Sequence, residues 1–275
     1  MMDASGILRT ALFVPATRPE RFPKAFASGA DAVIVDLEDA VEPAAKDAAR
    51  ANLAQAAERH GDVPLLVRVN GAGTPWHVAD LKACAALPGV NGIVLPKAES
   101  ADQILEAGAA GQPVFPIVES ARGVRDLAGL AGAHGVDRLV LGTLDLMLDL
   151  GVTPATAGAD LLLGEVRCQV LVQSRACRLA PPLDGVHSDI SDGVGLARAA
   201  RLSCEMGFGG MLCIHPTQVG IVAGAFAPSS DELDWARRVI AQAEATGSSA
   251  FRLDSRMVDQ PVIEWARRII ARANV

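Results

Sequence analysis

The chain is poor in aromatic residues: its 275 residues include seven Phe, three Trp and no Tyr. It has no apolar stretch close to the roughly 20 residues that span a bilayer, and its first residues lack the apolar segment of a signal peptide. Basic residues are the minority, 25 against 32 acidic ones, and the formal net charge is −7 at pH 7. We therefore expect a cytoplasmic protein with no general affinity for nucleic acids or membranes, although a local basic patch for an anionic ligand remains possible.

Nucleotide-binding and zinc-binding motifs are also missing. No Gly-x-Gly-x-x-Gly opens a helix after a strand and no Gly-x-x-x-x-Gly-Lys-[Ser/Thr] occurs, which disfavours the open nucleotide-binding folds. The five cysteines form no Cys-x-x-Cys pair, and no His/Cys cluster has zinc-binding spacing. We interpret the cysteines as small buried hydrophobic residues in a reducing compartment.

What the chain has is a regular series of short apolar runs separated by amphipathic or Ala-rich helical segments. Apolar strands that alternate with helices are typical of a parallel sheet covered on both faces. Eight such units favour a closed (β/α)8 TIM barrel over an open sheet, and we expect this barrel to occupy residues 1–228. The expected strands are residues 11–16, 32–38, 65–70, 92–97, 114–120, 138–145, 182–188 and 210–216, and the expected helices are residues 42–59, 77–86, 100–108, 123–132, 159–178 and 192–206.

The last part of the chain follows a different pattern. Residues 231–246 and 257–273 have the apolar spacing of two further amphipathic helices, joined by a polar connection at residues 247–254. We expect residues 229–275 to form a C-terminal helical extension that packs on the barrel or on a neighbouring subunit.

Several expected strands end in charged residues. Residues 31–43 are an apolar strand that ends in a cluster of carboxylates, and a buried charge is costly unless it is paired or bound to a metal. Active sites of TIM barrels lie at the C-terminal ends of the strands. The charged or polar residues expected there are Arg18, Asp36, Glu38, Asp39, Arg68, Asn70, Lys97, Glu119, Asp145, His187 and His215.

Glu119 and Asp145 are the candidate metal ligands, because they follow the apolar runs of two adjacent strands. Two carboxylates completed by substrate oxygens and water are a usual site for Mg²⁺. A pair of salt-bridged acids at the barrel rim is the alternative. Asp36, Glu38 and Asp39 are expected to hold metal-bound water and to orient Arg68.

Arg68 interrupts an otherwise apolar strand, and its planar guanidinium suits bidentate binding of a substrate carboxylate. A structural ion pair with Asp36 or Glu38 is the alternative, and the two roles are compatible. Arg18 and Lys24, at the expected start of the first helix, are candidates for binding a phosphate group or form a solvated basic surface. Asn70 is a further candidate for substrate binding.

Lys97 and His215 allow more than one interpretation. Lys97 could be a Schiff-base nucleophile, but an acidic rim would keep its ammonium protonated and oppose that role. His215 could be a general acid/base or an orienting donor behind the metal ligands, and a structural histidine is the alternative.

An ordered set of motifs resembles the citrate lyase β-subunit-like family of the HpcH/HpaI aldolase superfamily. The resemblance runs nearly end to end and is carried by Leu12-Phe-Val-Pro-Ala-Thr-Arg-Pro, Val35-Asp-Leu-Glu-Asp-Ala-Val, Val67-Arg-Val-Asn, Leu95-Pro-Lys, Pro116-Ile-Val-Glu-Ser, Gly142-Thr-Leu-Asp-Leu-Met-Leu-Asp-Leu-Gly, Asp184-Gly-Val and Cys213-Ile-His-Pro-Thr-Gln.

The resemblance implies a Mg²⁺-dependent barrel that cleaves a carbon–carbon bond in a 3-hydroxy-acyl-CoA thioester of the citramalyl, malyl or citryl type, giving acetyl-CoA and a 2-oxo acid. It assigns the metal to Glu119 and Asp145 and the substrate carboxylate to Arg68, and to these we add Glu38 as a further candidate catalytic residue. It also implies a homo-oligomer, a trimer or a hexamer, in which Asp259 of a neighbouring subunit is the acid/base. The alternative for Asp259 is an N-cap of the last helix.

Two departures from the family pattern affect the expected acyl and CoA contacts. Gly210-Met-Leu stands where relatives often have a basic residue, and Leu146 stands where they often have an aromatic one. Thioester hydrolysis and cleavage of a citryl group on an acyl carrier therefore remain alternatives on the same metal site. A barrel that binds an acyl-CoA or a partner without turnover is the alternative of a different class.

Overall fold

The structure is a computed structural model that describes residues 7–247 and 250–273. The chain divides into two compact units, Met1–Ala223 and Gly224–Val275. The functional domain division expected after residue 228 remains a prediction. Among the helices of the described residues, none combines the length and the apolar composition that a membrane span requires.

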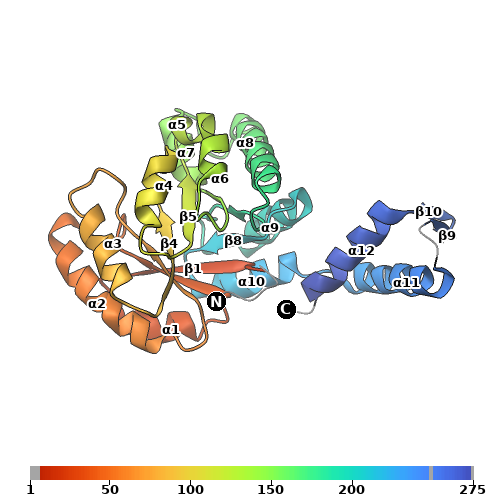
Figure 1. Cartoon of the computed structure of the whole chain (residues 1–275), viewed down its shortest axis with the longest axis horizontal. Coiled ribbons are helices and arrows are strands. Elements are labelled where there is room, and N and C mark those ends of the chain that lie inside the picture. The colour runs from red at the N-terminus through yellow and green to blue at the C-terminus, as the bar shows by residue number, and fades with distance from the viewer. Residues whose placement is uncertain (1–6, 248–249, 274–275) are drawn as a thin grey trace. The chain divides into compact units, whose positions relative to one another are not determined.

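The first unit is a closed parallel barrel of eight strands, which confirms the expected TIM barrel (Figure 1). Each strand pairs with the next in sequence, and β8 closes the barrel against β1. The strands are β1 (Thr10–Pro15), β2 (Ala32–Asp36), β3 (Leu65–Arg68), β4 (Val90–Leu95), β5 (Val114–Val118), β6 (Val140–Leu141), β7 (Leu183–Asp184) and β8 (Gly210–Cys213).

Helices follow the strands and form the outer layer of the barrel (Figure 1). They are α1 (Phe22–Phe26), α2 (Lys46–Arg59), α3 (His77–Ala85), α4 (Ala101–Ala107), α5 (Ala121–Arg125), α6 (Leu127–Gly132), α7 (Thr143–Asp149), α8 (Ala157–Ala176), α9 (Gly193–Met206) and α10 (Pro216–Phe226), with 3-10 turns η1 (Pro19–Arg21) and η2 (Pro43–Ala45). The helix expected at residues 123–132 is two helices, α5 and α6, that meet at Asp126.

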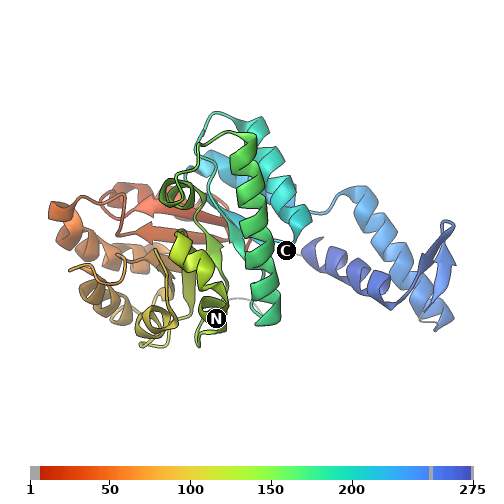
Figure 2. The ribbon, with the colours of Figure 1, turned by 90° about the horizontal axis from the view of Figure 1, so that it is seen from above.

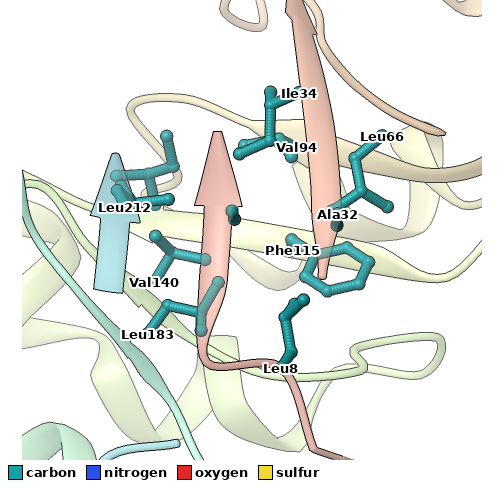
Figure 3. Close-up of a cluster of buried hydrophobic side chains, with 11 residues drawn as sticks. Leu8, Ala32, Ile34, Leu66, Val94, Phe115, Val140, Leu183 and Leu212 are labelled. Carbon is teal, nitrogen blue, oxygen red and sulfur yellow. The ribbon is translucent and has the colours of Figure 1, made fainter. Parts of the chain in front are cut away.

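The barrel interior is filled by side chains from alternate positions of the strands (Figure 3). The buried cluster consists of Leu8, Ala11, Ala32, Ile34, Leu66, Val94, Phe115, Ile117, Val140, Leu183 and Leu212. Gly92 on β4 makes room for the largest of them: a Cβ at Gly92 would lie 2.6 Å from the Phe115 ring. Because this packing closes the interior of the barrel, ligands are confined to its ends.

Most strands are shorter than the sequence indicates, and at β6 this changes the place of a candidate ligand. Residues 138–145 were expected to form a strand, but β6 ends at Leu141. The Leu146 amide donates to the Gly142 carbonyl at 3.1 Å and so starts α7. Asp145 therefore lies in the first turn of α7 instead of at a strand end, still on the C-terminal side of β6.

The second unit is a helical hairpin with a small antiparallel sheet. It contains α11 (Ser230–Thr246), β9 (Phe251–Leu253), β10 (Arg256–Val258) and α12 (Gln260–Ala273), and α11 and α12 pack side by side (Figure 2). Its own core is Ala236, Val239, Val258, Ile263, Ala266 and Ile269. The two expected helices are present, but β10 covers residues that were expected to begin the second helix, and α12 starts at Gln260.

Candidate active site

A cavity of about 440 Å³ opens where the barrel strands end at their C-terminal side. Four carboxylates and one guanidinium that the sequence singled out line it: Asp36, Asp39, Arg68, Glu119 and Asp145. The rest of its wall is largely apolar and includes Phe13, Ile117, Leu141, Leu144, Val186, Leu212 and Ile214. The fold thus brings residues from seven different strands or strand–helix connections to one site.

Arg68 is fixed in this cavity by the carboxylates of the strand next to it. Its Nε donates to Asp36 Oδ1 at 2.8 Å and its Nη2 to Asp36 Oδ2 at 2.7 Å, a bidentate pair. Nη1 lies 3.1 Å from Glu38 Oε2 and 3.3 Å from Asp39 Oδ2. Burial alone would lower the pKa of Arg68, but its hydrogen bonds to Asp36 and the neighbouring carboxylates outweigh burial and raise it.

The guanidinium of Arg68 also lies over the ring of Phe13, 4.8 Å from its centroid. The amides of Glu38 and Ala40 donate to Asp36 at 2.9 and 3.2 Å, so both oxygens of Asp36 are already engaged. Asp36 therefore forms a bidentate ion pair with Arg68, and the Nη1 edge of the guanidinium is directed toward Glu38 and Asp39.

Glu119 follows β5 directly and is 4% exposed. Its Oε1 accepts a hydrogen bond from the Lys97 backbone amide at 2.7 Å. Burial raises the pKa of Glu119 to about 7; the Lys97 amide opposes this rise, and the carboxylates of Asp145 and Glu38 add to it. The carboxylates of Glu119, Asp145 and Glu38 thus repel one another in a partly enclosed space, and a bound divalent cation would reduce that repulsion.

A glycine makes room for Glu119. A Cβ on Gly142, between β6 and α7, would lie 2.6 Å from Cβ of Glu119 and closer still to its Oε2. The two oxygens of Glu119 therefore face different neighbours: Oε1 is held by Lys97 and Oε2 points toward the turn that carries Asp145. Sequence reasoning missed Gly142, although its place between an apolar strand and the candidate ligand Asp145 was a usable signal.

Lys97 follows β4 and has a φ of +51°. Its Nζ donates to Glu38 Oε1 and lies 3.8 Å from Asp39 Oδ1. Burial would lower the pKa of Lys97, but the hydrogen bond to Glu38 and the surrounding carboxylates outweigh burial and raise it. A raised pKa keeps the ammonium protonated, which opposes the Schiff-base role considered for this residue.

Glu38 forms ion pairs with both Lys97 and Arg68. Burial raises the pKa of Glu38, against the opposing effect of Arg68 and Lys97. Lys46 stabilises the loop that carries Glu38, because its Nζ donates to the carbonyls of Leu37 and Glu38 at 2.8 and 2.7 Å. Lys46 was not singled out in the sequence, because nothing in its local pattern distinguishes it from a surface lysine.

Other candidates lie outside the main cavity. Asn70 is buried, and its Nδ2 donates to the Leu37 carbonyl at 3.0 Å and to Asp80 at 2.6 Å, which makes it a structural tie behind the acidic loop. The ring Nε2 of His187 lies 3.4 Å from Asp192. Asn70 thus links the loop after β2 to α3, and neither Asn70 nor His187 is among the residues that line the two cavities of this site.

A second cavity of about 360 Å³ is lined by Arg21, Lys24, His215 and residues of β1. Nδ1 of His215 lies 2.7 Å from Thr217 Oγ1. Arg18 is half-exposed, pairs with Glu20 at 2.6 Å and does not line this cavity. Arg21, one helical turn away in the same basic segment, takes the position that the sequence gave to Arg18.

Asp259 lies in the second unit, directly before α12. Its Oδ1 accepts a hydrogen bond from the Val262 amide at 3.4 Å, and its carbonyl accepts one from Ile263 at 3.0 Å. This is the N-cap arrangement that was the alternative reading of the residue. A capping carboxylate keeps a second oxygen free for other contacts.

Comparison with known proteins identifies the chain. The family model described as HpcH/HpaI aldolase/citrate lyase matches residues 9–216, and a model described as C-C bond lyase of the TIM-barrel fold matches residues 168–275. The citrate lyase subunit beta-like protein of Mycobacterium tuberculosis is 41% identical over 271 residues, covering 95% of this chain and 94% of the relative. A (3S)-malyl-CoA thioesterase of Cereibacter sphaeroides is 34% identical, covering 91% of this chain and 89% of the relative.

Solved structures agree. The CitE protein of M. tuberculosis in complex with magnesium, acetoacetate and coenzyme A has a TM-score of 0.87 and 38% identity, covering 98% of this chain and all of that one. The same protein with magnesium and pyruvate has a TM-score of 0.78 and 35% identity, over 98% of this chain and all of that one. The chain belongs to the HpcH/HpaI aldolase/citrate lyase family and is an enzyme of the carbon–carbon lyase type.

Proposed function

We propose that this enzyme is a Mg²⁺-dependent lyase that cleaves a 3-hydroxy-acyl-CoA thioester to acetyl-CoA and a 2-oxo acid. The observation that carries the proposal is the meeting of Glu119, Asp145 and Arg68 in one cavity. Two carboxylates for a metal and a guanidinium for a carboxylate are what a 2-hydroxy acid or 2-oxo acid group requires. The relatives with magnesium, pyruvate, acetoacetate and coenzyme A support this assignment.

Glu119 and Asp145 would hold the metal. Burial and the carboxylates of Asp145 and Glu38 raise the pKa of Glu119, and a cation bound beside it would favour its ionised form. The metal supplies Lewis-acid polarisation of the substrate oxygens. Asp36 and Asp39 are paired with Arg68, so we assign them to orienting the guanidinium and not to binding the metal.

Arg68 would bind and orient the carboxylate of the acyl group, which fixes the scissile bond over the cavity. In the cleavage step the 3-hydroxyl loses its proton, the carbon–carbon bond breaks, and its electron pair passes to the acetyl thioester as an enolate. A proton donor must then protonate the acetyl methyl carbon. We assign the role of accepting the hydroxyl proton to Glu38, which lies beside Arg68 with Oε2 3.1 Å from Nη1, and the role of donating a proton to the acetyl methyl carbon to Asp259 of a neighbouring subunit.

The charges around the cavity favour an acyl group with a single free carboxylate. Arg68 is the only cationic residue among the described residues that line the cavity, and apolar side chains such as Leu212 and Ile214 form the wall beyond it. A citryl group brings a second carboxylate that would meet this apolar wall without a partner, at a cost of several kcal/mol for an unpaired buried charge. Citramalyl and malyl groups avoid that cost.

The second cavity suits the phosphate groups of coenzyme A. Arg21 and Lys24 both line it, and it shares Phe13 and Ile214 with the main cavity. We therefore assign the nucleotide part of the substrate to Lys24 and Arg21. Lys24→Ala should raise KM for the CoA ester and leave KM for the same acyl group on pantetheine unchanged.

Hydrolysis of the thioester is the second candidate, because a relative at 34% identity is a (3S)-malyl-CoA thioesterase. The deciding experiment supplies citramalyl-, malyl- and citryl-CoA with Mg²⁺ and identifies the products. Acetyl-CoA with a 2-oxo acid supports cleavage, whereas free CoA with a hydroxy acid supports hydrolysis. Acceptance of only a citryl group on an acyl carrier would point to a citrate lyase subunit, and tight binding without turnover to a non-catalytic barrel.

The assembly and the compartment are part of the same proposal. A trans role for Asp259 requires a homo-oligomer, and we propose a trimer or a hexamer of these chains in the cytoplasm. Light scattering on the purified protein gives the number of subunits directly, and a monomer would exclude the trans role.

A further inference from the structure

Lys97 is in a backbone conformation that costs free energy. A φ of +51° lies in the left-handed region of the backbone, which residues other than Gly, Asn and Asp rarely adopt. Strained backbone of this kind persists where the surroundings hold it, and it gathers at functional sites. The strained backbone of Lys97 therefore indicates that this residue has a function in the active site.

The conformation lets one residue contact both halves of the site. The Lys97 amide donates to Oε1 of Glu119, the candidate metal ligand, at 2.7 Å. The ammonium of the same residue donates to Glu38 Oε1, and Glu38 Oε2 lies 3.1 Å from Nη1 of Arg68. Arg68 in turn is tied to Asp36. The contacts form a continuous line from the metal carboxylate to the carboxylate-binding guanidinium.

We infer that Lys97 is a positioning residue that sets the spacing between the metal ligand Glu119 and the guanidinium of Arg68. This rests on the proposed function, since the spacing matters only if one substrate bridges the metal and Arg68. The amide arm orients Glu119 and the ammonium arm holds Glu38 against Arg68. In this role Lys97 does not contact the carbon atoms of the bond that is cleaved.

The two arms can be tested separately. Lys97→Met keeps the backbone amide and the length of the side chain but removes the ammonium, so Glu38 and Arg68 lose their support while Glu119 keeps its hydrogen bond. We expect kcat/KM to fall about 10- to 100-fold, the range for a lost hydrogen bond to a charged group. The Mg²⁺ dissociation constant, measured by titration calorimetry without substrate, should stay within about threefold of the wild type.

Rescue distinguishes positioning from general structure. Lys97→Arg restores a cation with donors and should recover part of the lost kcat/KM, mainly through KM. Lys97→Gly relieves the strained φ but lacks the ammonium. It should therefore melt at a higher temperature than Lys97→Met and have a similarly low kcat/KM. Because it favours the native backbone, it also serves if Lys97→Met does not fold.

The chain offers a matched control at Arg178. This cation also has a positive φ, +58°, but it follows α8 at the opposite end of the barrel and is exposed. Arg178→Met and Arg178→Gly should leave kcat, KM and Mg²⁺ binding unchanged. They remove a cation at a left-handed position without touching the active site.

Three results would overturn the inference: unchanged kcat/KM in both Lys97→Met and Lys97→Gly, an equal loss in the Arg178 variants, or a covalent adduct. The last is tested by adding sodium borohydride with pyruvate and measuring the mass of the intact protein, since a Schiff base on Lys97 would be reduced to a stable secondary amine. Failure of the lyase proposal appears separately, as wild-type protein that binds Mg²⁺ but cleaves no thioester.

Discussion

The sharpest prediction concerns a single methyl group at Gly142. In Gly142→Ala the new Cβ would lie 2.6 Å from Cβ of Glu119 and 2.9 Å from Cγ2 of Ile117. Carbon atoms in contact prefer about 3.5–4.0 Å, so Glu119 must move by about 1 Å. Ile117 and Glu119 are both buried and both line the cavity, but Ile117 also packs in the hydrophobic core of the barrel, so we expect the Glu119 side chain to be the one that moves.

A shift of about 1 Å in a group that positions the reaction can cost about 100-fold in rate, or about 2.7 kcal/mol. We therefore expect Gly142→Ala to bind Mg²⁺ more weakly and to lose about two orders of magnitude in kcat/KM. Overpacking also destabilises the fold by about 1–3 kcal/mol. The assays are titration calorimetry with Mg²⁺, steady-state kinetics, and thermal unfolding with and without the metal.

Gly164→Ala is the matched control, because nothing lies within 4 Å of a Cβ at Gly164 in α8. It should keep full activity and stabilise the protein by up to about 1 kcal/mol through helix propensity. If Gly142→Ala binds Mg²⁺ and turns over like the wild type, the contact between this turn and Glu119 does not position the metal ligand, and the assignment of the site is wrong.

Three further changes follow from the same contacts. Burial raises the pKa of Glu119 from 4.5 to about 7, so the folded metal-free protein binds a proton more tightly than the unfolded chain and should lose stability as the pH rises through that interval. Mg²⁺ should therefore raise the melting temperature more at pH 8 than at pH 5, and an equal rise at the two pH values would contradict this. Arg68→Lys keeps the charge but loses the bidentate pair with Asp36, so KM should rise about 10- to 100-fold in steady-state assays with kcat less affected; unchanged KM would remove Arg68 from substrate binding. Asp259→Asn keeps an N-cap and so should keep the melting temperature while activity falls; if Asp259 acts in trans, mixing Arg68→Ala and Asp259→Asn subunits by refolding should recover part of the activity, and no recovery would place Asp259 with its own barrel.

The sequence was informative where local chemistry is repeated. Apolar runs ending in charge located the strands of the barrel and its functional end, since period and composition depend on near neighbours only. Asp36, Arg68, Glu119 and Asp145 do meet in one cavity. Arg18 shows the limit: three basic residues lie within one short segment, and only the fold decides that Arg21 and Lys24, and not Arg18, line the second cavity.

The sequence by itself determined the barrel, its C-terminal extension and the set of acids and bases at the strand ends, because these follow from hydrophobic periodicity and from the cost of burying charge. Only the tertiary structure decided which charge meets which. Asp36 is committed to Arg68, Lys97 reaches Glu119 and Glu38 at once through a left-handed backbone, and Asp145 lies on a helix that starts where Gly142 leaves room for Glu119. These pairings join residues that are 22 to 59 positions apart in the chain, and no local pattern encodes such distances.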